Sequence, residues 1–229
     1  MPEAASMNLA LFDLDHTLLP IDSDYEWGQF LARIGAVDRV EFEKRNAAFF
    51  AQYQNGTLDP VAYLEFALGT LAQFPRRQLD AWHAQYMDEV IRPAMRPAAL
   101  DLVKRHQDAG DLVGIVTATN RFVTAPIADA FGIQHLLAAE PELTLGGELT
   151  GRLVGVPTNG HGKVSHTRDW LARRGQSLQD FGSSHFYSDS QNDLPLLSLV
   201  THPVATNPNP TLAAHARAQG WPILELFND

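Results

Sequence analysis

The segment LFDLDHTLLP (11–20) places two carboxylates, Asp13 and Asp15, at the end of an apolar run that starts at residue 8. Short continuous apolar runs are typical of strands that are buried on both faces of a sheet. An ionised carboxylate removed from water costs several kcal/mol unless it is paired or bound to a metal ion. The segment therefore predicts a strand that ends in a functional site.

Further apolar runs of similar length follow, and helical patterns lie between most of them. This alternation is typical of an α/β fold in which helices cover both faces of a parallel sheet. The sequence therefore predicts a Rossmann-like, doubly wound parallel sheet. Its strands are expected at 8–12, 111–119, 135–140, 185–190 and 202–207. A helix is expected over 96–110, where Gly110 suits the C-terminal cap.

The stretch 20–92 is much longer than the roughly 2 to 6 residues that usually connect a strand to a helix. Its own pattern is helical, with Ser23 and Glu26 spaced as a capping box before the first helix. We therefore expect a helical cap at 20–92, built from four helices, inserted into a core formed by 1–19 and 93–229. A β-hairpin is expected at 143–155.

Composition limits the classes of partner. The chain has 229 residues, no cysteine, and 17 basic against 27 acidic side chains, which gives a net charge of −10. Such a charge disfavours nucleic acid and anionic membranes as partners. No apolar run approaches the roughly 20 residues that span a bilayer, and the first residues do not resemble a signal peptide. We expect a cytoplasmic protein, whose oligomeric state the sequence leaves open.

Polar side chains recur at the ends of the predicted strands. Asp13 and Asp15 follow the first strand, Thr117 ends the second, and 189–193 follow a later one, while Lys163 precedes a helix. Ligands of open α/β sheets bind beyond the carboxyl ends of the strands, at the switch in strand order. These separate stretches are therefore expected to converge on one site.

Four motifs in this order resemble those of the haloacid dehalogenase superfamily of phosphohydrolases. They are DLDHT (13–17), Thr117 within IVTAT, Lys163 within GHGK, and SDSQND (188–193). The helical insertion between the first two motifs is similar to the phosphoserine phosphatase-like branch with its helical cap. Four motifs in order are far more specific than one.

The resemblance implies a two-step mechanism. Asp13 attacks phosphorus and forms an aspartyl phosphate, while Asp15 protonates the leaving oxygen and later takes a proton from the attacking water. It also implies a Mg2+ ion held by Asp13, the backbone carbonyl of Asp15 and Asp189.

The same resemblance assigns supporting roles. Lys163 neutralises Asp13 and the transferring phosphoryl group, and Thr117 with the amide groups after it, including that of Ala118, binds phosphoryl oxygens. Asp193 orients a metal-bound water or Lys163, and Asn192 belongs to the same surroundings.

The substrate stays open at this stage. Asp22 stands where phosphoserine phosphatases have a glutamate that receives the substrate's amino group, which implies a cation-binding role, although an acidic residue at a helix start also suits the helix dipole. Ala118 and Thr119 replace glycines that are usual in those enzymes. We expect the partner to be a small phosphate ester. Phosphoserine, histidinol phosphate and phosphorylated amino alcohols are all candidates.

Several alternatives accompany the hydrolase prediction. The same aspartyl phosphate suits a phosphotransferase, and a receiver domain or a non-catalytic binding protein is disfavoured because Asp15 and every other motif residue are present. His16 and His161 suggest a second metal only weakly. Aromatic residues of the insertion fit either a substrate cage or the core of the cap; they are Tyr25, Trp27, Phe49, Phe50 and Tyr53.

Overall fold

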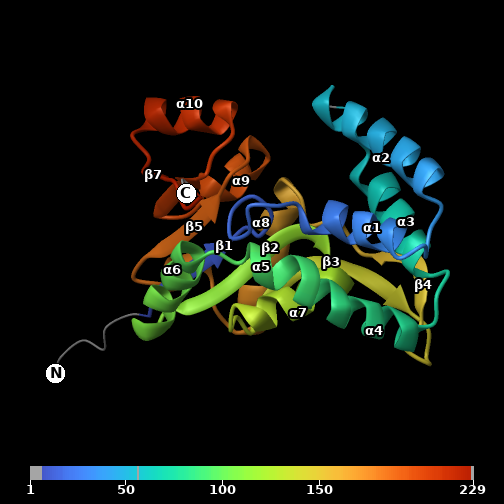
Figure 1. The fold of residues 1–229 in the computed structure, drawn as a ribbon. Helices are drawn as coiled ribbons and strands as arrows, with labels where there is room; N and C mark the ends of the chain where they lie inside the picture. The colour runs from blue at the N-terminus through green and yellow to red at the C-terminus, as the bar shows by residue number, and fades with distance from the viewer. Residues whose placement is uncertain (1–6, 56, 228–229) are drawn as a thin grey trace.

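A mostly parallel sheet forms the centre of the protein, with its strands in the order β4-β3-β2-β1-β5-β6-β7 (Figure 1). The computed structural model describes residues 7–55 and 57–227. All neighbouring strands run parallel except β3 and β4. The strands are β1 (Leu9–Phe12), β2 (Leu112–Asn120), β3 (His135–Leu143), β4 (Leu149–Val154), β5 (Ser184–Ser188), β6 (His202–Thr206) and β7 (Ile223–Leu224).

The predicted doubly wound α/β fold is confirmed, since each of the five expected strands overlaps a strand of this sheet. β1 lies in the middle, paired with β2 on one side and β5 on the other. The strand order reverses at this point, because the chain adds β2 and β3 on one side of β1 and later β5 and β6 on the other. The carboxyl end of β1, where Asp13 follows, is therefore the switch point at which ligands bind.

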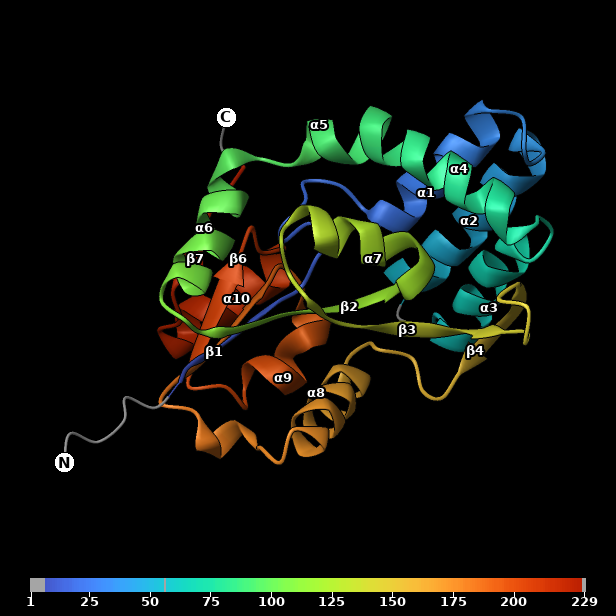
Figure 2. The same cartoon turned by 90° about the horizontal axis from the view of Figure 1, so that it is seen from below.

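Alternate side chains of β1 face opposite layers of helices. Ala10 and Phe12 belong to a core cluster shared with α6 (Pro97–Asp108) and α7 (Arg121–Ala130). Leu9 and Leu11 belong to a second cluster on the other face, shared with α8 (His161–Arg173), α9 (Leu194–Leu197) and α10 (Pro210–Gln219). Figure 2 shows α6 and α7 on one side of the sheet and α8 and α9 on the other. A strand covered on both faces explains the continuous apolar run.

The chain between β1 and α6 is helical, as the sequence predicts. It contains α1 (Ser23–Arg33), α2 (Arg39–Gln54), α3 (Pro60–Leu71), α4 (Arg76–Tyr86), a π-helical turn (Met87–Ile91) and the short α5 (Arg92–Ala94). Trp27 and Phe30 of α1 pack in the same core cluster as Phe122 and Val123 of α7. The inserted helices are thus joined to the sheet domain by a continuous apolar contact.

The start of α1 differs from the prediction. Asp22, and not Ser23, is the N-cap: its side chain accepts hydrogen bonds from the backbone N–H groups of Asp24 and Tyr25. Asp and Ser cap helices about equally well, so the pattern alone does not choose between neighbouring residues. The earlier start makes Ser23 the first helical residue, and its backbone N–H donates to Asp15 instead. The Ser23–Glu26 capping box is therefore wrong.

The predicted hairpin is present as β3 and β4, which pair antiparallel at the edge of the sheet. It packs against α3 of the insertion. A Cβ atom on Gly151 would lie 3.1 Å from Cα of Gly69, and the φ of Gly151 is +86°. Only glycine fits such a backbone and so close an approach. No helix in the described part of the chain is long and apolar enough to cross a membrane.

Candidate active site

The first motif lies in a tight loop after β1. Backbone hydrogen bonds from the N–H groups of Thr17, Leu18 and Leu19 all reach the carbonyl of Leu14. These leucines are fully buried and anchor the loop. His16 has a φ of +58°, which is uncommon for a side chain other than glycine. The loop brings Asp13 and Asp15 to the wall of a cavity at the carboxyl end of the sheet.

Lys163 joins two of the predicted carboxylates. Its Nζ lies 2.7 Å from Oδ1 of Asp13 and 2.7 Å from Oδ2 of Asp193, and only 3% of its side chain is exposed. Burial opposes the charge of this ammonium group, but the two carboxylates outweigh burial and hold the pKa of Lys163 above its ordinary value. Ser188 donates to the same oxygen of Asp193 at 2.7 Å. The first, third and fourth motifs thus meet at one buried cation.

Asp15 is held by two hydrogen bonds from different parts of the chain. The backbone N–H of Ser23 donates to Oδ1 at 2.7 Å, and the hydroxyl of Thr119 donates to Oδ2 at 2.9 Å. Burial, followed by repulsion from the nearby carboxylate of Asp22, raises the pKa of Asp15 to about 8. A carboxyl with a raised pKa is suited to give a proton near neutral pH. Thr119, which the sequence marks only as a departure from glycine, fixes the orientation of this group.

The second motif ends β2 and leads directly into α7. Thr117 is buried, its hydroxyl accepts a hydrogen bond from the backbone N–H of Thr119 at 3.2 Å, and Ala118 between them is exposed to the cavity. Asn120 caps α7 by accepting from the N–H of Val123. The positive end of a helix dipole therefore faces the place where the resemblance puts the phosphoryl group.

Asp189 lies beside this cluster, at the end of β5. Its backbone N–H donates to the hydroxyl of Thr17 at 3.0 Å. Burial, together with the nearby carboxylate of Asp13, raises the pKa of Asp189 to about 8. Asn192 also lines the cavity, and its backbone N–H donates to the hydroxyl of Ser190. Carboxylates crowded in this way are stabilised by any cation that binds between them.

The donor set fits a Mg2+ ion. Among the residues that the structure describes, no three His, Cys, Asp or Glu side chains come together as a metal chelate. The set implied by the sequence needs only the side chains of Asp13 and Asp189 with the backbone carbonyl of Asp15. Mg2+ prefers oxygen ligands and usually keeps several of its waters, so two carboxylates are sufficient. A second site at His16 or His161 stays an untested idea.

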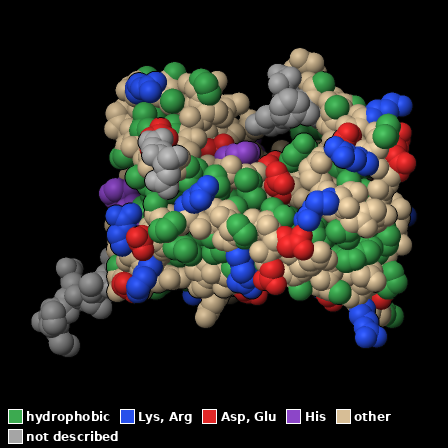
Figure 3. Space-filling view, viewed as in Figure 1, with side chains coloured by type: hydrophobic (Ala, Val, Ile, Leu, Met, Phe, Trp, Pro, Cys, Tyr) green, Lys and Arg blue, Asp and Glu red, His purple; other side chains and the backbone are tan. Residues whose placement is uncertain are grey.

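The cavity has a volume of about 860 Å3 and extends from the motif residues to the inserted helices α1, α2 and α3. The space-filling view is hollowed between the side that carries α10 and the side that carries α2 (Figure 3). Lys163 is the one lysine or arginine on the described wall of this cavity. The part of the wall that the inserted segment forms is acidic and aromatic. It includes Asp22, Asp24, Glu26, Glu43, Tyr25, Phe49 and Tyr63.

Asp24 belongs to this wall, and the sequence does not single it out. It is only 9% exposed. Tyr63 donates its hydroxyl to Oδ2 of Asp24 at 2.7 Å, and Asn120 donates its side-chain amide to Oδ1 at 3.2 Å. Burial raises the pKa of Asp24 to about 6, although the hydrogen bond from Tyr63 opposes this rise. No local pattern reveals this group, because its partners come from α3 and the end of β2.

The aromatic residues of the insertion divide into two groups. Trp27 is buried and stacks on Phe30 in the core. Tyr25 and Phe49 line the cavity, and Phe49 packs edge-on against Tyr63. The side chains of Phe50 and Tyr53 lie outside the described part of the structure. The two interpretations of these residues, cage and core, thus each apply to some of them.

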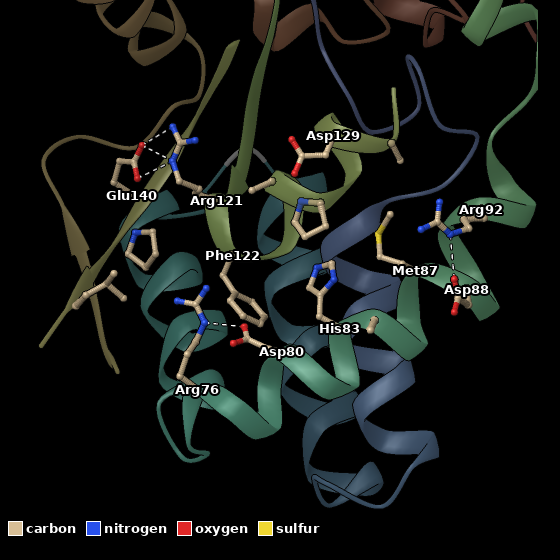
Figure 4. A pocket seen from close by; sticks show the side chains of 16 residues that line it. Arg76, Asp80, His83, Met87, Asp88, Arg92, Arg121, Phe122, Asp129 and Glu140 are labelled. Atoms are coloured by element: carbon tan, nitrogen blue, oxygen red, sulfur yellow. Dashed lines mark hydrogen bonds and ion pairs between the residues drawn. The ribbon is translucent and has the colours of Figure 1, made fainter. Parts of the chain in front are cut away.

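A second hollow of about 830 Å3 lies between α4 and α7 (Figure 4). Most of its charged side chains pair with one another, as Arg76–Asp80, Arg92–Asp88 and Arg121–Glu140. Exposed pairs of this kind contribute little energy. None of the four motifs reaches this hollow, so it is not the active site.

Comparison with known proteins agrees with this geometry. Residues 10–198 match the haloacid dehalogenase-like hydrolase family. The chain is 44% identical over 219 residues to the histidinol-phosphatase of Neisseria meningitidis serogroup C (strain 8013), covering 96% of this chain and 99% of that one. It is 34% identical to the phosphoserine phosphatase SerB1 of Mycobacterium tuberculosis (strain ATCC 25618 / H37Rv), covering 95% of this chain and 70% of that one.

A crystal structure of a protein of unknown function from Bordetella pertussis Tohama I is 51% identical, with a TM-score of 0.94, and covers 97% of this chain and 100% of that one. The four motifs, the meeting of three of them at Lys163, and these relatives all agree. The chain belongs to the haloacid dehalogenase-like hydrolases and is a phosphatase of the phosphoserine phosphatase-like branch.

Proposed function

We propose that the protein hydrolyses histidinol phosphate, a small cationic phosphate monoester, through an aspartyl phosphate on Asp13, with Mg2+ as cofactor. The arrangement of Asp13 and Lys163 supports the covalent step. Their 2.7 Å contact places the carboxylate of Asp13 beside a fixed positive charge. A carboxylate in this state attacks phosphorus, and the ammonium group offsets the negative charge of the phosphoryl group as it approaches.

The proposed reaction has two steps. An oxygen of Asp13 bonds to phosphorus as the ester bond breaks, and Asp15 gives its proton to the departing alkoxide. A water molecule then attacks phosphorus and gives a proton to Asp15, which releases inorganic phosphate and restores both carboxyl groups. Bound Mg2+ supplies further positive charge for the phosphoryl oxygens. Thr119 and the amide of Ser23 hold Asp15 in place through both steps.

The charge of the cavity supports histidinol phosphate as the substrate. Lys163 is the one lysine or arginine on its described wall, and it is already paired with Asp13 and Asp193. A substrate with its own carboxylate, such as phosphoserine, finds no further cation there. Histidinol phosphate carries an amino group and an imidazole ring but no carboxylate, which suits an acidic and aromatic wall. The similarity of the chain to the Neisseria histidinol-phosphatase points the same way.

The inserted helices support a preference for small molecules. They form the wall opposite the motif residues, and a cavity of about 860 Å3 holds a metabolite and not a folded phosphoprotein. We propose that residues 20–92 act as the cap domain over a core of 1–19 and 93–229. Asp22, which caps α1 and lines the cavity, adds negative charge to the cap side. Closing such a cap excludes water from the site.

A panel of phosphate esters tests this proposal. Histidinol phosphate, phosphoserine, phosphoethanolamine and glycerol 3-phosphate are compared at equal concentration with Mg2+, and again with excess chelator. Phosphate release should be fastest with histidinol phosphate and absent in chelator. A higher kcat/KM for phosphoserine would contradict histidinol phosphate as the substrate. Undiminished turnover in chelator would contradict Mg2+ as the cofactor. Transfer of phosphate to an added alcohol, in place of release, would indicate a phosphotransferase.

A further inference from the structure

Asp24 is a buried carboxylate without a positive partner. In the described part of the chain no lysine, arginine or histidine forms an ion pair with it; its hydrogen bonds come from the neutral groups of Tyr63 and Asn120. A buried carboxylate is costly unless a cation compensates it. The rise of its pKa expresses this cost. Asp24 therefore keeps a negative charge that no cation of the described chain compensates.

Asp24 lies on the wall of the active-site cavity. Asp24 and Tyr63 both line it, and the wall around them carries further carboxylates and no free lysine or arginine in the described residues. Burial and the neighbouring carboxylate of Asp24 hold the pKa of the Tyr63 hydroxyl above its ordinary value, so this hydroxyl remains a hydrogen-bond donor. A positively charged ligand entering the cavity would supply the missing partner.

Asp22 is less suited to the same task. Its Oδ1 accepts from the backbone N–H groups of Asp24 at 3.0 Å and Tyr25 at 2.9 Å, as the N-cap of α1. These two amides already donate to its carboxylate. Binding a ligand cation therefore gains less at Asp22 than at Asp24, where no amide of the helix compensates the charge.

We infer that Asp24, oriented by Tyr63 and Asn120, is the specificity-determining carboxylate that receives the cationic end of the substrate. This inference rests on the proposed function and adds the residue that selects the substrate. Asn120 connects this group to the catalytic side, because it follows Thr119 and caps α7. Asn120 thereby ties Asp24 to the strand end that carries Thr117 and Thr119.

The test compares Asp24→Asn with the wild-type enzyme. The amide keeps the shape of the side chain and removes its charge. Two measurements are made: the ratio of kcat/KM for histidinol phosphate to that for p-nitrophenyl phosphate, and competitive inhibition by histidinol, which carries the cation without the phosphate. We expect the ratio to fall at least about tenfold and the Ki of histidinol to rise at least about tenfold, as for a lost charge-assisted contact.

Two further variants serve as controls. Asp38→Asn removes a charge from an exposed N-cap of α2 outside the cavity, and should leave both measurements unchanged. Tyr63→Phe removes the hydroxyl that orients Asp24 and should raise the Ki of histidinol by a smaller factor. It also provides the test if Asp24→Asn does not fold.

The outcomes separate the two proposals. If Asp24→Asn lowers turnover of both substrates equally and leaves the Ki of histidinol unchanged, Asp24 is structural and the inference is wrong. If Asp24→Asn does not fold, an unchanged Ki in Tyr63→Phe overturns the inference in the same way. If the wild-type enzyme itself shows no preference for histidinol phosphate over phosphoserine, the proposed function fails instead. A tenfold loss confined to Asp22→Asn would place the cation at Asp22.

Discussion

The ammonium of Lys163 lies 2.7 Å from the carboxylate of Asp13, although 150 residues separate the two in the chain. This contact holds the loop after β1 to the first turn of α8, and with Asp193 it forms a buried triad of one cation and two anions. Removing one member of a buried ion pair leaves the others without compensation. Lys163 is therefore expected to serve both catalysis and stability.

The first prediction is that Lys163→Met lowers kcat by at least about a hundredfold and the free energy of unfolding by about 3 to 5 kcal/mol. Lys104→Met is the matched control. Lys104 pairs with Asp108 on the surface of α6, with 67% of its side chain exposed, and should change stability by less than about 1 kcal/mol. Urea unfolding and steady-state kinetics measure both effects. Similar stability in the two variants would contradict the importance of the triad.

Much of this site can be predicted from the sequence, because polar residues mark the ends of the buried strands. The order of the strands in a parallel sheet then brings those ends to one edge. Asp13, Thr117 and Asp189 each end a buried run, and parallel strands place such ends together. The structure also places Lys163 against Asp13, as the resemblance implies. These residues can be recognised because each belongs to a short motif that is complete within its own segment of the sequence.

Other features depend on contacts that no local pattern encodes. Asp24 meets Asn120 across 96 residues and Tyr63 across 39. The predicted cap of α1 is wrong for a related reason: Asp22 and Ser23 are both good capping residues, and the choice depends on the bond from the N–H of Ser23 to Asp15. Tertiary contacts decide between options that are equal locally.

The second prediction concerns the metal ion. Mg2+ at about a hundred times its Kd should stabilise the protein by about 2.7 kcal/mol, which corresponds to a rise in Tm of roughly 5 to 10 °C for a chain of this size. Asp189→Asn should remove most of this rise, because it deletes one of two ligand side chains. Asp88→Asn, on the exposed rim of the second hollow, is the control and should keep it. Thermal unfolding with and without Mg2+ decides; an equal rise in Asp189→Asn would exclude that ligand.

The third prediction separates the two carboxylates of the first motif. Asp13→Asn should abolish turnover and the phosphoenzyme together, since the nucleophile is lost. Asp15→Asn with p-nitrophenyl phosphate, whose leaving group needs no proton, should still be phosphorylated but hydrolyse the intermediate slowly. The phosphoenzyme should therefore accumulate in Asp15→Asn. Mass spectrometry of acid-quenched protein locates the phosphate, and a modified residue other than Asp13 would refute the mechanism.

The fourth prediction concerns Thr119, whose hydroxyl donates to Asp15 at 2.9 Å. Thr119→Val keeps the shape and loses the hydrogen bond. A hydrogen bond to a charged group contributes about 1.5 to 3 kcal/mol, so kcat should fall roughly ten- to a hundredfold with little change in KM. Thr119→Ser retains the hydroxyl and should restore most of kcat. Equal losses in the valine and serine variants would show that packing, and not the hydroxyl, matters at this position.

The fifth prediction uses the pH dependence of Asp24. Its pKa rises from 3.8 to about 6 in the folded protein, so the folded state binds the proton more tightly than the unfolded state. The stability from this group is complete below about pH 4 and is lost as the pH rises through about 6. Two pKa units correspond to at most about 3 kcal/mol.

Asp24→Asn does not titrate and should therefore be more stable than the wild-type protein at pH 7.5, with a smaller advantage at pH 5. Urea unfolding of both proteins at the two pH values gives this difference, and groups common to both proteins cancel from it. Saturating histidinol at pH 7.5 should reduce the advantage, because the bound cation compensates Asp24 in the wild-type protein only. An advantage that is equal at both pH values would show that Asp24 is already neutralised by a partner in the folded chain.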